Sequence, residues 1–265
     1  MENKIVVKHN AGFFSCCSVR LTRIAQFINS NKTIPVHVDS SDQFKWYKTG
    51  SNITRDITFD YFKDYNNDVY IDTQRKISFY WNHQWKNYSE LDYDTLVPLV
   101  KKYFTPTDEI YSIAGALERK YNLVYENTCV LLYRGNDKNS EIKKCDYSEY
   151  LYNANILLDY NKDLVFLIQS DETEFIEFMS DNFKHNSFYF NDEIRHMKKC
   201  DSTVDKRMVD NIFNFSKKYL AITTILSKCK YIVCSSGNCD LWTLLYRGNC
   251  VNVTQHQRDG SWVVH

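Results

Sequence analysis

The chain has 265 residues, a hydrophobic fraction of 43% and only three prolines, which indicates a folded globular protein without long disordered segments. Its 33 basic and 33 acidic residues balance, so no overall electrostatic field favours nucleic acid or anionic membranes as partners. The start lacks a signal-peptide pattern and no window approaches the roughly 20 apolar residues that span a bilayer, so we expect a soluble, cytoplasmic protein.

The first forty residues predict a strand, a glycine-containing loop, a helix and a second strand. Residues 4–8 (KIVVK) and 34–39 (IPVHVD) are the strands, and apolar positions recur with helical spacing from about 16 to 29. This order of elements is typical of a parallel sheet.

Residues 40–89 show little periodicity, and we expect loops there, a short strand at 69–72, and an acceptor-binding insertion. Helices are predicted at 93–104 and 106–121. Thr105 is the expected cap of the second helix and Pro106 its first helical residue.

The second half alternates regularly between short apolar runs and helical patterns, which predicts a doubly wound open sheet of five strands. The predicted strands are 129–133, 164–169, 187–190, 231–234 and 249–253, and the predicted helices are 147–158, 173–183, 206–229 and 239–246. We therefore expect an α/β protein with two Rossmann-like lobes, residues 1–122 and 123–265, that face each other across a cleft.

Three polar loops follow strands of the second half, at residues 134–138, 170–172 and 235–238. Ligands of open parallel sheets bind beyond the carboxyl ends of the strands, so these loops are expected to line one pocket. The guanidinium of Arg134 suits two phosphates, Ser235 and Ser236 start a helix that suits an anion, and Asp171 could accept hydrogen bonds from a ribose or a base. Together they indicate a nucleoside diphosphate.

Each loop also has a purely structural interpretation. An arginine beside an acidic residue often forms a surface ion pair, and SDE and SSGN are both common helix-capping sequences. The occurrence of all three loops at equivalent strand ends favours the binding site.

The motifs LLYRGNDK, VFLIQSDETEFIEF and YIVCSSGNCDLWTLLYRGN resemble, in order and spacing, those of GDP-fucose-dependent fucosyltransferases of the α-1,6 and protein O-fucosyltransferase types. The loop HNAGFFSCCSVRL resembles the glycine-rich loop that opens the acceptor lobe in that group. The resemblance implies a GT-B fold with the donor in the second lobe.

By matching positions, the resemblance implies that Arg134 contacts the donor diphosphate. It implies donor-binding roles also for a set of further residues: Gly12, Asp137, Asp171, Ser235, Ser236 and Asn238. Three positions depart from the family pattern, because Leu132 replaces a histidine, Gly135 a second arginine and Ser15 a loop asparagine.

The implied activity is an inverting glycosyl transfer from a GDP-sugar, with fucose the first choice, to a hydroxyl of a glycan or another acceptor. No cofactor and no metal are expected, because arginine and helix-start N–H groups replace a divalent cation. His9 is the candidate base, with Asp39 and Asp42 as competitors.

Other readings stay open at this point. The missing second arginine favours a transferase with a different nucleotide sugar or a non-catalytic nucleotide-sugar-binding module. The aromatic character of residues 44–88 would fit an interaction protein without a small ligand. The nine cysteines lack zinc-ligand spacing and are expected to be reduced thiols.

Overall fold

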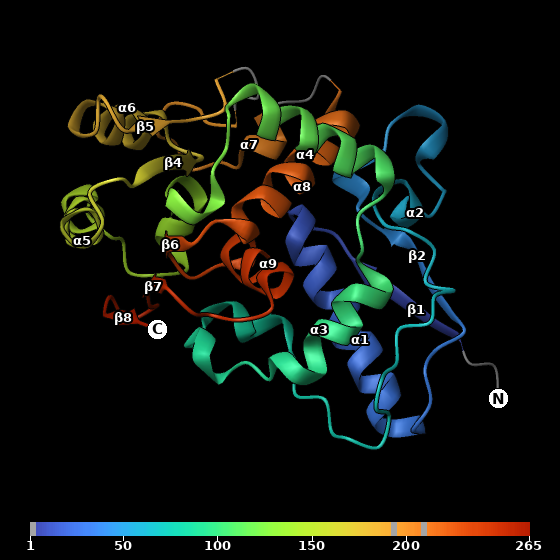
Figure 1. Ribbon diagram of the computed structural model, residues 1–265. Coiled ribbons are helices and arrows are strands. Elements are labelled where there is room, and N and C mark those ends of the chain that lie inside the picture. Colours follow the sequence, from blue (N-terminus) through green and yellow to red (C-terminus); the bar gives the residue numbers. More distant parts are fainter. Residues whose placement is uncertain (1–3, 192–194, 208–210) are drawn as a thin grey trace.

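The computed structural model describes residues 4–191, 195–207 and 211–265. Figure 1 shows a larger sheet flanked by helices, with a smaller two-stranded sheet and a long helix beside it. The small sheet and the long helix come from the start of the chain, and the larger sheet comes from its second half.

The first half begins with a parallel strand pair, β1 (Lys4–His9) and β2 (His37–Gln43), joined by helix α1 (Phe13–Asn31). Residues 44–92 are mostly irregular. Their short elements are η1 (Lys45–Tyr47), η2 (Gly50–Asn52), α2 (Thr58–Tyr61), η3 (Trp81–Trp85) and η4 (Tyr88–Glu90). Helices α3 (Tyr93–Tyr103) and α4 (Asp108–Lys120) complete this half.

The second half forms a six-stranded sheet in the order β5-β4-β3-β6-β7-β8, parallel except for β8. Its strands are β3 (Thr128–Tyr133), β4 (Val165–Ser170), β5 (Ser187–Phe188), β6 (Tyr231–Cys234), β7 (Val253–His256) and β8 (Trp262–Val264). The short elements η5 (Tyr125–Asn127) and η6 (Asn136–Ser140) precede and follow β3, and the helices are α5 (Tyr147–Tyr160), α6 (Thr173–Asn182), α7 (Val204–Arg207), α8 (Ile212–Lys228) and α9 (Asn238–Arg247).

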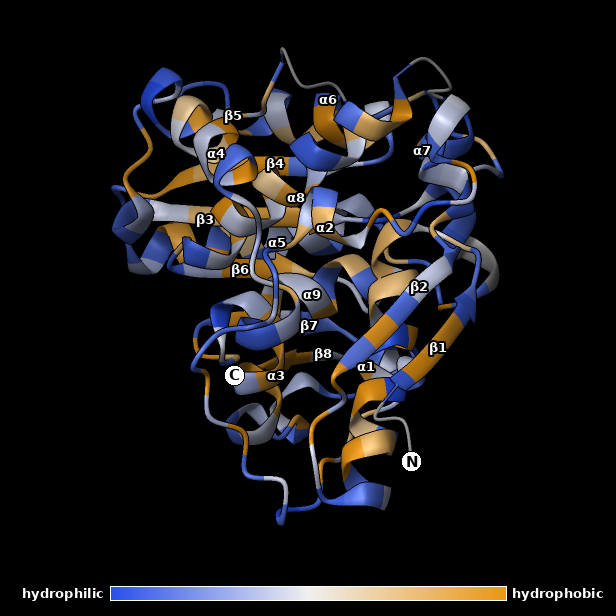
Figure 2. Ribbon diagram, turned by 90° about the vertical axis from the view of Figure 1, so that its right-hand side faces the viewer, coloured by the Kyte–Doolittle hydropathy of each residue, from blue (hydrophilic) through white to orange (hydrophobic). Residues whose placement is uncertain are grey.

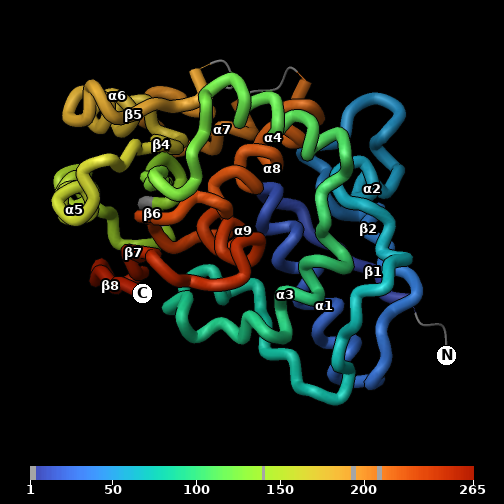
Figure 3. Tube along the Cα trace, in the orientation of Figure 1, coloured from blue at the N-terminus to red at the C-terminus, as the bar shows by residue number. Residues whose placement is uncertain are grey.

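Strand β3 is buried on both faces, and its side chains alternate between two hydrophobic clusters. Cys129, Leu131 and Tyr133 face the cluster under α5 and α6, whereas Val130 and Leu132 face the cluster under α8 and α9. Figure 2 shows the resulting apolar strands between more polar helix surfaces, and Figure 3 shows α5 and α6 on the side of the sheet away from α1.

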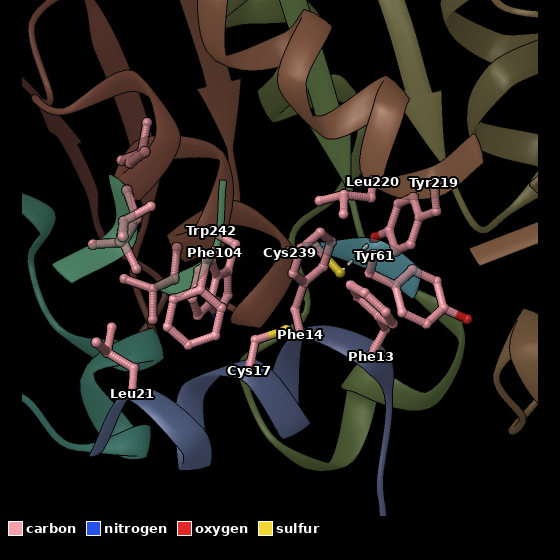
Figure 4. Packing of buried hydrophobic residues seen from close by; sticks show 14 of the residues in the cluster. Phe13, Phe14, Cys17, Leu21, Tyr61, Phe104, Tyr219, Leu220, Cys239 and Trp242 are labelled. Atoms are coloured by element: carbon pink, nitrogen blue, oxygen red, sulfur yellow. Dashed lines mark hydrogen bonds between the residues drawn. The ribbon is translucent and has the colours of Figure 1, made fainter. Parts of the chain in front are cut away.

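The second of these clusters continues without a break into the first half of the chain. Trp242 of α9 is fully buried, and its ring lies 4.7 Å from Phe104 and 6.1 Å from Phe14, measured between ring centroids. The indole Nε1 donates to Ser18 Oγ of α1 at 2.9 Å. Figure 4 shows side chains of α1 and α9 meeting in this shared core. The boundary at residue 122 itself stays a prediction.

Several predicted elements of the first half are placed differently. Residues 69–72 form no strand, and the second strand begins three residues later than predicted, at His37. Helix α4 starts at Asp108 with Thr107 as its N-cap, not Thr105. The predicted first residue, Pro106, instead forms an isolated bridge with Phe62, which extends the chain just before the helix.

The second half also departs in detail from the prediction. The expected helix at 206–229 corresponds to α7 and α8, and its residues 208–210 lie outside the described part of the chain. The last predicted strand begins four residues later, at Val253, because residues 249–252 form the turn after α9. Strand β8 was not predicted, since its apolar run of three residues carries little periodicity.

Two expectations concern cysteines and membranes. All nine cysteines are free thiols, as predicted. In the described part of the chain, helices fall short of the length and apolarity that a bilayer crossing needs.

Replacing Trp242 with alanine should lower the free energy of unfolding by about 3–5 kcal/mol, because it leaves a large cavity where the two halves meet. Denaturant unfolding followed by circular dichroism measures this change. Tyr160→Ala is the control, since that side chain is 83% exposed and its loss should cost no more than about 0.5 kcal/mol. Equal stability of the two variants would contradict a shared core.

Candidate active site

The three predicted loops converge because their strands are neighbours. Strands β4, β3 and β6 are adjacent and parallel, so their carboxyl ends lie along one edge of the sheet. In register, Tyr133 lies opposite Ser170, and Leu132 opposite Cys234. The residues that follow these positions therefore meet.

Asp171 joins the loops after β3 and β4. Its carboxylate is buried and accepts hydrogen bonds from Arg134 Nε and from the backbone N–H of Gly135, both at 2.9 Å. Its carbonyl oxygen accepts from Asn136 Nδ2 at 2.6 Å. Burial raises the pKa of Asp171, and the charge of Arg134 opposes that shift. Asp171 thus positions the arginine loop.

The outer end of Arg134 reaches toward α9. Nη1 donates to Cys239 Sγ at 2.9 Å, and Nη2 donates to Asp137 Oδ1 at 3.0 Å. The Tyr219 hydroxyl donates to the same sulfur at 2.6 Å, as Figure 4 shows. Burial alone lowers the pKa of Arg134, but Cys239, Asp171 and their neighbours hold it well above its usual range, so the guanidinium stays charged.

A cavity of about 830 Å³ opens beside Arg134, and residues of both halves line it. This volume is typical of sites for organic ligands, which span about 300–1,000 Å³. Of the predicted site residues, five line the cavity: His9, Gly12, Arg134, Asp137 and Asn238. The other three, Asp171, Ser235 and Ser236, lie behind its wall.

Two helices begin at this cavity. Helix α1 starts after Gly12 without a side-chain cap, and its first residues Phe13 to Ser15 line the wall. Helix α9 starts at Asn238, also without a side-chain cap. Unpaired N–H groups and the positive end of the helix dipole favour anions at such positions. Lys138 adds a further cation to the wall.

Ser235 and Ser236 are almost fully buried, and their hydroxyls point into the protein. Ser235 Oγ donates to Asp240 Oδ2 at 3.3 Å, and Ser236 Oγ donates to the carbonyl of His256 at 2.9 Å. In this arrangement they shape the turn before α9, and direct phosphate contact by their hydroxyls stays a prediction. Burial raises the pKa of Asp240 to about 7.

The same turn is attached to the first half of the chain. Asn238 accepts from Ser18 Oγ at 2.7 Å and donates to Gln84 Oε1 at 2.9 Å. The backbone N–H of Gly237 donates to the Tyr88 hydroxyl at 3.2 Å. The start of α9 is therefore positioned by α1 and by residues 84–88.

The candidate base His9 lines the cavity at the end of β1. Its Nε2 lies 3.0 Å from Ser15 Oγ, and burial lowers its pKa below the usual value. A neutral imidazole at neutral pH can accept a proton. Sequence reasoning found His9 but missed this pairing with Ser15.

The competing acids lie elsewhere. Asp39 and Asp42 form ion pairs with Lys4 and Lys8, and neither lines the cavity. The chain also has one Asp-x-Asp triplet, a pattern that can hold a metal, at residues 92–94. Both its carboxylates contact Arg75 and lie away from the cavity.

Position 135, where the family pattern has a second arginine, has no room for a side chain. A Cβ atom on Gly135 would lie 2.1 Å from a carboxylate oxygen of Glu172. Glu172 is fully buried and accepts a hydrogen bond from the Tyr147 hydroxyl, which limits its movement. Glycine is therefore required by the close approach of this acid.

Four aromatic side chains lie on the cavity wall, a position that the sequence did not predict. Trp46, Tyr80, Trp81 and Trp85 line the side of the cavity formed by the first half. Tyr80 and Trp81 are 52% and 49% exposed, so their rings are accessible to a ligand. They lie in and beside short 3₁₀ turns, which have no periodicity for sequence analysis to detect.

No protein-family model matches the sequence, and no curated protein matches it significantly. Solved structures do match. The chain is similar over its full length to the α-1,6-fucosyltransferase NodZ soaked with GDP-fucose, with a TM-score of 0.58, 11% identity and 99% of that chain covered. NodZ co-crystallised with GDP gives 0.59, 11% and 98%.

A third structure, fucosyltransferase NodZ from Bradyrhizobium, matches with a TM-score of 0.57 at 12% identity, covering 100% of this chain and 99% of that one. The predicted fold class is confirmed: the protein has a fucosyltransferase-like GT-B fold. All three of these solved structures are of NodZ, so the chain shares its fold with NodZ.

Introducing a methyl group at Gly135 should destabilise the protein by about 1–3 kcal/mol, because Glu172 must move and lose its contact with Tyr147. Unfolding of Gly135→Ala measures this. In a double-mutant cycle, Glu172→Ala should remove most of the added cost of the alanine. Strictly additive effects would show that the two residues do not clash.

Proposed function

We propose that this protein is a glycosyltransferase that moves a sugar from a GDP-sugar, with GDP-fucose the first candidate, to an acceptor hydroxyl. The observation that carries this proposal is the buried contact of Arg134 with Asp171, beside a cavity where two helices begin. The fold shared with NodZ, which was solved with GDP and with GDP-fucose, supports the choice of donor.

The donor diphosphate would lie against Arg134 and the start of α9. The guanidinium, the first N–H groups of α9 and the ammonium of Lys138 offer positive charge to the leaving group. Such groups can take the place of a divalent cation at the reaction centre. The transfer is therefore proposed to be metal-independent.

In the proposed reaction, the acceptor oxygen attacks the anomeric carbon from the face opposite the nucleotide. The bond from that carbon to the phosphate oxygen breaks, and the diphosphate leaves with the bonding electrons. The acceptor proton passes to His9, whose imidazole lies on the cavity wall beside Ser15. Attack from the opposite face inverts the anomeric configuration.

The acceptor would bind the aromatic wall of the first half. Accessible rings of Tyr80 and Trp81 offer flat apolar faces that suit the C–H faces of a sugar. Arg23, Gln26 and Glu141 add polar groups to the same cavity for hydroxyls. A glycan fits this mixture better than a purely apolar acceptor.

A non-catalytic nucleotide-sugar-binding module is the second candidate, because Gly135 replaces the second arginine of the family pattern. The two candidates differ in one measurement. Both bind GDP, but only the transferase converts a GDP-sugar in the presence of acceptors. A thermal-shift panel of nucleotide sugars identifies the donor, since a bound ligand raises the melting temperature.

Arg134→Lys should weaken GDP binding roughly 10- to 100-fold, because lysine keeps the charge but loses charge-assisted hydrogen bonds worth about 1.5–3 kcal/mol. Calorimetry measures the affinity. Arg55→Lys is the matched control, since Arg55 forms an exposed pair with Asp60 outside the cavity. If the GDP affinity is unchanged in both Arg134→Lys and the control, the loop of Arg134 does not bind the donor.

His9→Gln should lower kcat by about 10²- to 10⁴-fold while the KM for the donor changes little. In the unchanged protein, kcat should rise with pH through the pKa of His9, which burial lowers below its usual value, because only the neutral ring accepts a proton. The variant should lack this acidic limb. His37→Gln, on an exposed residue, is the control. A retained acidic limb in His9→Gln rules out His9 as the base.

Trp81→Ala should raise the KM for a glycan acceptor about 3- to 10-fold, from the loss of one aromatic contact of about 0.5–1.5 kcal/mol. GDP affinity should not change, because the ring comes from the first half of the chain, whereas Arg134 and the start of α9 belong to the second half. Tyr70→Ala, which is exposed and outside the cavity, serves as the control. An altered GDP affinity with a normal acceptor KM would place the donor, not the acceptor, on this wall.

A further inference from the structure

A second group of chemically reactive side chains lies behind the donor loops. Cys145 lies two residues before α5, Glu149 is in the first turn of that helix, and His256 ends β7. One ligand atom from each, a sulfur, a carboxylate oxygen and an imidazole nitrogen, lies within 4.8 Å of the other two. Cys145 and His256 are 3% and 1% exposed.

Two of the three side chains, those of His256 and Cys145, are incompletely satisfied by the protein. Nδ1 of His256 is buried and has no hydrogen-bond partner among the described residues, an arrangement that destabilises the folded protein. Cys145 Sγ makes a weak contact of 3.4 Å with the carbonyl of Asp146. Together, a buried thiol, a carboxylate and an imidazole with one unpartnered nitrogen form a set of possible metal ligands.

Neighbouring groups hold these side chains in place. Trp262 Nε1 donates to Glu149 Oε2 at 2.9 Å, and the backbone N–H of Asp146 donates to Glu149 Oε1 at 3.3 Å. The Trp262 ring also lies 5.0 Å from the His256 ring, between centroids. Hydrogen bonds and packing of this kind orient the ligands of metal sites.

We propose that Cys145, Glu149 and His256 bind one Zn²⁺ ion. Thiolate, imidazole and carboxylate are all ligands that zinc accepts in proteins. The thiol proton leaves to solvent as the sulfur binds, and the two negative ligands then neutralise the charge of the ion. A neutral cluster avoids the large cost of burying an isolated charge.

The three ligand atoms would have to move only slightly closer together to bind a zinc ion. Zinc bonds of about 2.0–2.3 Å hold tetrahedral ligands about 3.3–3.8 Å apart, against the present limit of 4.8 Å. Glu149 also lines a small surface pocket with Trp262 and Ser148, which gives the ion an entry path and leaves room for water as a fourth ligand.

This site is structural and separate from the proposed transfer reaction. None of its three residues lines the main cavity. The link is the backbone of His256, whose carbonyl accepts from Ser236 Oγ at 2.9 Å, while Gln255 Nε2 donates to the same hydroxyl at 2.9 Å. A metal ion that fixes His256 would therefore steady the turn before α9.

The first test is a titration of the full chain, after dialysis against a chelator, with Co²⁺ as a spectroscopic substitute for zinc. The expected result is saturation at one equivalent with a thiolate-to-cobalt charge-transfer band in the near ultraviolet, which Zn²⁺ then abolishes. This readout depends on neither GDP nor turnover, so it stands whether or not the protein is a transferase. Absence of the thiolate band overturns the proposal.

Variants show which sulfur and which imidazole bind. Cys145→Ser and His256→Gln should each weaken the cobalt band and reduce the rise in melting temperature that Zn²⁺ produces, whereas the control Cys250→Ser should behave like the unchanged protein. Cys250 is partly exposed and is not a member of the Cys145, Glu149 and His256 cluster. An equal zinc-induced rise in all four proteins indicates adventitious binding elsewhere and overturns the proposal.

Discussion

The buried carboxylate of Asp171 is the interaction on which the candidate site depends. It accepts one hydrogen bond from the side chain of Arg134 and another from the backbone beside it, so it fixes both the loop and the direction of the guanidinium. An unpaired charge at this depth would be strongly destabilising, and this penalty keeps the two residues together. The cation is thus preorganised at the cavity before any anion arrives, which lowers the reorganisation that binding requires.

The second constraint is that residues of the first half hold the turn before α9 in place. Gly237 and Asn238 are held by Tyr88, Gln84 and Ser18 of the first half. The continuous core around Trp242 lies directly behind these contacts. A relative movement of the two halves would have to break hydrogen bonds at the start of α9. The turn therefore couples the shape of the cavity to the packing between the halves.

Sequence analysis predicted the second half well because its strands are short apolar runs that end in polar loops. β3, β4 and β6 and the convergence of their loops followed from this pattern and from the topology of parallel sheets. The pattern did not reveal which way each side chain turns. Ser235 and Ser236 are buried at the end of β6, and their hydroxyls face inward to Asp240, His256 and Gln255. The aromatic character of residues 44–88 was noted, but the position of residues 80–85 on the cavity wall was missed, since 3₁₀ turns carry no hydrophobic period.

The contact between Gly135 and Glu172 restricts the mutational paths open to this protein. Any side chain at position 135 would meet a buried acid that is already held by Tyr147. A variant that was to acquire an arginine there would have to lose or replace Glu172 first, since the reverse order passes through a strained intermediate. The order of the substitutions, and not only their final combination, would therefore decide whether a stable variant with an arginine at position 135 can arise from this sequence.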